Sequence, residues 1–174
     1  MNRMLRFALL LGLAGVMAII TPIAGWAHEN RQVADGVYNL EVGFISEPAF
    51  VNQQNGLFLM VQRVEPDVEV TPSAVVEAEE EAGHHGDGSG VIGLESTLQA
   101  EVIYINQRMP LVLSPTEQPG VYESIFFPTA VGDYSFRIYG TIEGISIDET
   151  FTSSPQGFDS VKDPAPLQFP NIGG

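Results

Sequence analysis

The chain has 174 residues, contains no cysteine and carries a formal net charge of −15 at pH 7. Without cysteine there can be no disulfide, thiolate metal site, cysteine nucleophile or lipid-modified N-terminal cysteine. The acidity disfavours binding to nucleic acid or to anionic membranes and favours cations or basic partners, although a solvated exterior accounts for the same charge. Apolar residues make up 44% of the chain, which is enough for one domain held together by its core.

The segment before His28 has the parts of a secretory signal peptide. Arg3 and Arg6 precede an apolar run of about 14 residues over 7–20, and the segment ends in Gly25-Trp26-Ala27. This run is shorter than the roughly 20 residues that span a bilayer. We therefore expect residues 1–27 to be removed on export, which places the mature protein in the periplasm or outside the cell. Cleavage after Ala27 makes His28 the new N-terminus.

The rest of the chain alternates apolar and polar residues between turn-forming Gly, Pro and Asn, which is the pattern of short β-strands. Tyr38, Leu40, Val42 and Phe44, for example, alternate with polar or small residues. We predict strands over residues 38–44, 57–61, 98–104, 109–113, 122–126, 134–139 and 145–152. About seven short strands at roughly ten-residue spacing predict an all-β, immunoglobulin-like antiparallel β-sandwich over residues 28–163.

The sequence Gly132-Asp133-Tyr134 resembles a tyrosine corner of such sandwiches, in which a tyrosine hydroxyl at a strand start bonds to upstream backbone. An ordinary core tyrosine is the alternative. In both cases we expect Tyr134 to be structural.

Two segments are predicted to lie outside the sandwich core. Residues 65–90 are rich in Glu and Asp, and we interpret them as a flexible acidic loop inserted between two strands. The chain from Ser153 onward contains several prolines, so we expect it to be extended and loosely attached, with residues 164–174 as a Pro/Gly tail. We expect no membrane insertion after signal cleavage.

The three histidines, His28, His84 and His85, are the candidate metal ligands. A mature N-terminal histidine can chelate a metal through its amine and Nδ1, and a second imidazole can complete a site for Cu(II) or another divalent metal. For His28 the alternative is the start of a frayed terminus. For His84 and His85 the alternative is a solvated tract that binds metals weakly.

Catalytic motifs are missing. There is no G-x-S-x-G, no H-E-x-x-H and no Gly-rich phosphate loop after a strand. Glu143, Asp148 and Glu149 lie near a predicted hairpin and have the residue types of a glycosidase carboxylate pair, but solvated hairpin charges explain them better. We expect no enzymatic activity.

Several phrases along the chain are similar to those of known proteins: Tyr38–Phe44 with Glu47-Pro48-Ala49, Asn55-Gly56-Leu57, Gly93-Leu94-Glu95-Ser96-Thr97-Leu98, Pro119-Gly120-Val121-Tyr122, Gly132-Asp133-Tyr134-Ser135-Phe136-Arg137, Gly140-Thr141-Ile142-Glu143-Gly144 and Asp148-Glu149-Thr150-Phe151. Together they resemble uncharacterised exported bacterial proteins of the YtkA-like and CopC-like group. The resemblance implies an immunoglobulin-like fold. CopC-like proteins are periplasmic Cu(II) carriers that use a mature N-terminal histidine, an acidic residue and a further histidine; His28 is the ligand matched by position.

Two functions are consistent with these features. The first is an exported, non-catalytic β-sandwich binding module that binds Cu(II) or another divalent cation through His28, with His84 or His85 as a second ligand. The second is a structural or protein-interaction module of the cell envelope that binds no metal and contacts a partner protein through its acidic loop and exposed sheet edges.

Overall fold

A computed structural model describes residues 28–65, 88–155 and 157–170. The predicted signal peptide, most of the predicted acidic insert with His84 and His85, and the end of the predicted tail lie outside these residues.

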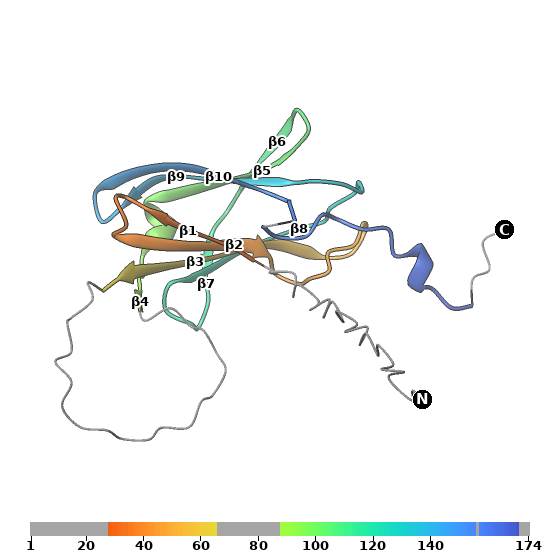
Figure 1. Cartoon of the computed structure of the whole chain (residues 1–174), viewed down its shortest axis with the longest axis horizontal. Helices are drawn as coiled ribbons and strands as arrows, with labels where there is room; N and C mark the ends of the chain where they lie inside the picture. Colours follow the sequence, from red (N-terminus) through yellow and green to blue (C-terminus); the bar gives the residue numbers. More distant parts are fainter. Residues whose placement is uncertain (1–27, 66–87, 156, 171–174) are drawn as a thin grey trace, which may run out of the picture.

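The described residues form two antiparallel sheets packed face to face (Figure 1). The first sheet has the order β1 (His28–Val33), β2 (Tyr38–Phe44), β3 (Asn55–Val64), β8 (Val121–Phe126) and β7 (Ser114–Pro115), and β4 (Gly88–Gly90) pairs with the end of β3. The second sheet has the order β10 (Ile145–Thr152), β9 (Ser135–Ile142), β5 (Leu98–Tyr104) and β6 (Gln107–Leu111). Two short 3-10 helices, η1 (Leu94–Ser96) and η2 (Ala165–Leu167), complete the description. The fold is the predicted immunoglobulin-like β-sandwich.

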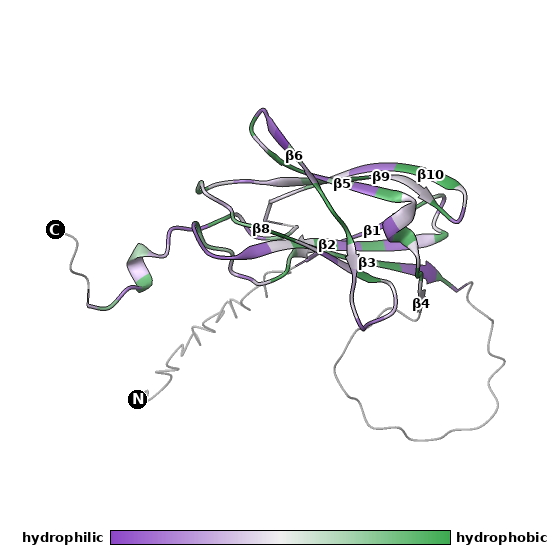
Figure 2. Cartoon of the chain, turned by 180° about the vertical axis from the view of Figure 1, so that it is seen from behind, coloured by the Kyte–Doolittle hydropathy of each residue, from purple (hydrophilic) through white to green (hydrophobic). Residues whose placement is uncertain are grey.

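The core lies between the sheets and is built from alternate residues of each strand, as the banding of apolar and polar residues along the strands illustrates (Figure 2). Phe44 is at its centre. Its ring lies 5.4–6.3 Å from four other aromatic rings, which come from both sheets and from the C-terminal segment: Phe126, Tyr134, Phe136 and Phe158. Edge-to-face contacts of this kind stabilise a core beyond the area that they bury.

All the predicted strands are present: β2, β5 and β10 have the predicted ends, whereas the ends of β3, β6, β8 and β9 are shifted. The prediction omitted β1, β4 and β7. β1 was missed because its sequence, His28–Val33, is mostly polar and lacks an alternating pattern, yet it pairs with β2 along its whole length. β4 falls inside the predicted insert, residues 65–90, so the last three residues of that insert belong to a strand.

Tyr134 forms the predicted tyrosine corner. Its hydroxyl donates to the carbonyl of Ala130, 3.1 Å away and four residues upstream, and accepts from the amide of the same residue. The ring itself is buried. The corner therefore fixes the loop that enters β9.

The expectation that the chain is loosely attached from Ser153 onward is wrong for residues 153–155 and 157–162. Phe158 and Val161 are buried in the core, and the backbone of Lys162 bridges to Phe50. The apolar side chains in this segment fill the end of the sandwich, so the prolines do not detach it. Beyond it, the segment with η2 stands away from the sheets (Figure 1).

The two lateral edges of the sandwich differ. Between β1 and β10, Arg31 donates to Glu149 (2.8 Å) and lies over the ring of Phe151 at 4.3 Å, which closes that edge. At the opposite edge the chain passes from β6 to the two-residue β7, which pairs within the described residues only with Tyr122 and Glu123 of β8. We call this second edge the open side.

Among the described residues, no helix is long and apolar enough to cross a membrane.

Candidate functional site

His28 begins β1, at one end of a row of paired residues that crosses the first sheet. It lies opposite Gly43, which lies opposite Phe58, which in turn lies opposite Glu123 on β8. Because Gly43 has no side chain, the His28 ring reaches over it and stacks on Phe58, with centroids 4.5 Å and planes 10° apart. His28 is therefore held in the sheet and is not part of a frayed terminus.

Both ring nitrogens of His28 face acceptors. Nδ1 is 2.8 Å from a Glu41 carboxylate oxygen, and Nε2 is 3.2 Å from the carbonyl oxygen of Phe44. Two acceptors require two N–H donors, which only the imidazolium supplies. Burial lowers the pKa of His28, but the hydrogen bonds to Glu41 and Phe44 and the charges of Glu41 and Glu47 outweigh it, so the pKa is raised. This arrangement favours a protonated histidine.

Glu47 is the second titratable group of this cluster. Burial raises the pKa of its carboxyl to about 7; the backbone amides of Asp159 and Phe44 act against the rise, and the Asp159 carboxylate adds to it. Its Oε1 atom is buried and has no hydrogen-bond partner among the described residues. An oxygen without a donor is easier to bury when the carboxyl carries a proton.

We expect the free energy of unfolding to fall as the pH rises through this cluster's titration. The pKa of Glu47 is about 7 when folded against 4.5 in the unfolded chain, and that of His28 is raised above 6.5. Since the folded state therefore binds more protons, raising the pH favours unfolding. Glu47→Gln should flatten the dependence and stabilise the protein above pH 7 by about 1 kcal/mol, allowing for solvent screening.

Urea denaturation between about pH 5 and pH 8 measures this effect. Glu95→Gln, which removes an exposed carboxylate from η1, is the matched control and should keep the wild-type slope. A Glu47→Gln protein with the full wild-type pH dependence would contradict the assignment.

The structure brings His28 together with Glu41 and Glu47, but not with the other sequence-predicted ligands, because His84 and His85 lie outside the described residues. Within the described residues, no group of three His, Cys, Asp or Glu side chains is arranged to hold a metal ion. Nδ1 of His28, which an N-terminal copper chelate needs, already contacts Glu41. A metal at this atom would have to displace that carboxylate.

The three carboxylates considered as a glycosidase pair have structural partners instead. Glu143 bonds to Arg63 and Tyr38, Asp148 forms a bidentate pair with Arg137, and Glu149 bonds to Arg31. Each of the three carboxylates binds an arginine, which agrees with their interpretation as hairpin charges.

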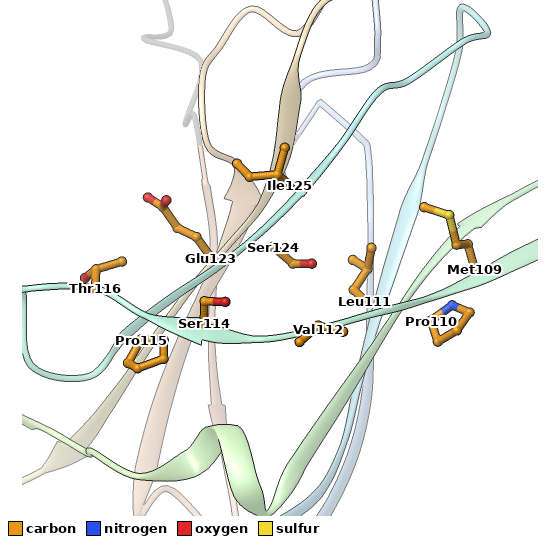
Figure 3. Close-up of a pocket in the computed structure, with 10 residues that line it drawn as sticks. All are labelled: Met109, Pro110, Leu111, Val112, Ser114, Pro115, Thr116, Glu123, Ser124 and Ile125. Carbon is orange, nitrogen blue, oxygen red and sulfur yellow. The ribbon is translucent and has the colours of Figure 1, made fainter.

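A groove of about 490 Å³ lies on the open side, between the β6–β7 segment and β8 (Figure 3). It is lined by Met109, Pro110, Leu111, Val112, Ser114, Pro115, Thr116, Glu123, Ser124 and Ile125. In Figure 3 the side chains of Leu111 and Ser124 lie between the two segments. A neighbouring hollow of about 270 Å³ shares Met109 and adds Phe127 and Tyr134. The two hollows therefore lie on either side of one shared wall residue, Met109.

Large apolar side chains are exposed around the groove. The exposed fractions are 81% for Val112, 59% for Phe127, 52% for Ile125 and 45% for Met109. Single exposed apolar residues are common on soluble proteins, but a cluster at a groove marks a contact surface. The residues that line the groove come from both sheets, so the open side presents an apolar surface on a rigid frame.

The free charge of the surface is acidic. Every arginine and lysine among the described residues is engaged in an ion pair with a carboxylate: Arg31, Arg63, Arg108, Arg137 and Lys162. Glu123, the one charged residue that lines the 490 Å³ groove, has no ion-pair partner among the described residues. A partner with basic side chains would therefore face no unpaired arginine or lysine among the described residues.

The groove was not predicted from the sequence. The signal for it was present in residues out of phase with the core pattern: Ile125 and Phe127 alternate with the buried Tyr122, Ser124 and Phe126 of the same stretch. Apolar residues on both faces of a strand indicate either two buried faces or a contact surface. Only the three-dimensional arrangement shows that the second face is uncovered.

The fold and its surface thus define an antiparallel β-sandwich with one closed edge and one open, apolar edge. Comparison with protein-family models, curated proteins and solved structures gave no match.

Proposed function

We propose that this protein is an exported, non-catalytic binding module that holds a basic protein partner on its open side. The observation that carries the proposal is the groove lined by exposed Val112, Ile125 and Met109, with exposed Phe127 in the neighbouring hollow. Apolar side chains supply the buried centre of a protein interface, and surrounding polar groups supply its rim.

Charge supports the choice of partner. The net charge of −15 and the paired state of every described cation leave a surface whose free charges repel an acidic protein and attract a basic one. The same charge disfavours self-association of this chain through the groove.

Export is part of the proposal and is supported by the composition of residues 1–27. Sequencing the N-terminus of the protein recovered from the periplasm or medium tests it. A mature chain that starts at His28 is the expected result, and recovery of the intact chain from the cytoplasm would contradict it.

Site-specific photo-crosslinking in the protein's own cells tests the groove. A photoreactive residue at Val112 should give one discrete crosslinked product. The control is the same residue at Ile145, which is also exposed but belongs to β10 at the closed side. Equal products from both positions, or none from Val112, would overturn the proposal.

A second candidate function is Cu(II) binding at His28, favoured by the carboxylates of Glu41 and Glu47 beside its ring. After cleavage at Ala27, the new amine and Nδ1 would chelate the metal once Glu41 is displaced. The test is Cu(II) titration of a chain that starts at His28 against one with an added N-terminal glycine. Tight one-to-one binding lost in the extended chain supports this function; identical weak binding in both excludes it.

A further inference from the structure

We infer that the groove takes an extended basic segment of the partner, which adds to the first sheet as a strand beside the free half of β8. The inference rests on the proposed function, since it names how the partner binds at that surface.

The free half of β8 is the first step. β7 pairs with Tyr122 and Glu123, while Ser124–Phe126 faces no strand on that side within the described residues. On its other side the same stretch is fully paired with β3, up to Phe126 opposite Asn55. Half of one sheet edge is thus exposed inside a groove.

The direction of the backbone groups is the second step. The N–H and C=O of Val121 bond to Gln118 and Thr116, on the β7 side. Backbone groups alternate in direction along a strand, so those of Ile125, four residues on, point to the same side. There they face the groove and are available to an incoming strand.

The neighbouring edges are protected, and this one is not. β6 and β7 each contain a proline, Pro110 and Pro115, which cannot donate to a new strand. The stretch Ser124–Phe126 contains neither proline nor lysine. Strand addition is a common mode of peptide recognition at such an edge.

Two side chains define the chemistry of the occupant. Glu123 and Ile125 project from the same face of β8, so an added strand that covers Ile125 with an apolar side chain places a neighbouring basic one near Glu123. Ser124 also lines the groove, where its hydroxyl can bond to the added segment.

The probe is a capped synthetic peptide of about six to eight residues with alternating valine and lysine. Amide chemical shifts of the full chain should change at Glu123–Phe126 on titration. Peptides methylated at one backbone nitrogen at a time should lose about tenfold in affinity at every second position, because alternate N–H groups face the pairing strand. A peptide of alternating valine and glutamate should not bind. Glu123→Gln should lower the affinity for the valine–lysine peptide and make that affinity less dependent on salt concentration.

Equal affinity for all the methylated peptides, or shift changes away from β8, would overturn the strand-addition inference. If crosslinking from Val112 still succeeded, the proposed function would stand with another binding mode. If crosslinking from Val112 and Ile145 gave equal products, the proposed function itself would fail, whatever the peptides do.

Discussion

Phe44→Ala should lower the free energy of unfolding by roughly 3–5 kcal/mol, the usual cost of removing a large aromatic side chain from a core. Phe44 is fully buried, and its ring contacts aromatic rings on both sheets and Phe158 of the C-terminal segment. The truncated side chain leaves a cavity that the rigid strands around it cannot close. Equilibrium denaturation in urea measures the loss.

Phe127→Ala is the matched control for this prediction. The same side chain is removed, but from a position that is 59% exposed beside the groove. Its unfolding free energy should change by less than about 1 kcal/mol, while partner binding weakens. Equal destabilisation by the two substitutions would show that the core is not centred on Phe44.

Gly140→Ala should destabilise the protein nearly as much. Gly140 is in β9 with φ of +129°, a conformation that side chains rarely adopt, and an added Cβ would overlap the carbonyl oxygen of Thr97. Backbone strain costs about 1–3 kcal/mol, and the overlap adds an overpacking cost of about 1–3 kcal/mol.

Gly144→Ala separates these two costs. Gly144 also has a positive φ, +87°, but an added Cβ meets nothing within 4 Å. Gly144→Ala should therefore lower the free energy of unfolding only by the conformational cost, about 1–2 kcal/mol. Unfolding of the two variants at the same urea concentration would contradict the claim that Gly140 lies too close to Thr97 for a side chain.

The strands of the core could be predicted because apolar residues alternate with polar or small ones along them, as β2 illustrates. β2 places Tyr38, Leu40, Val42 and Phe44 inward and polar or small residues outward. β1 could not be predicted in the same way, since edge strands bury little and its residues are held by backbone pairing and by contacts such as His28 on Phe58. The stacking of His28 on Phe58 depends on Gly43, which lies between them and has no side chain. The sequence of a single strand does not reveal this role, because it involves three strands.

Of the candidate sites, only His28 could be predicted from the sequence, because the other features depend on how the strands are arranged. His28 could be chosen from its place after the predicted cleavage site, but its partners, Glu41 and Glu47, follow from strand register and the turn after β2. The groove arises because β7 is only two residues long and does not extend alongside Ile125. A strand's length relative to its neighbour is a property of tertiary structure, so residue types alone did not identify this surface.

The most direct measurement of the central claim is quantitative co-purification of partner proteins from the protein's own cells with two variants of the full chain. Val112→Asp places a charge on the apolar rim of the groove, and Ile145→Asp places the same charge on the closed side. The proposal predicts that a basic protein recovered with wild type and with Ile145→Asp is lost with Val112→Asp. Recovery of the same proteins with all three would contradict it.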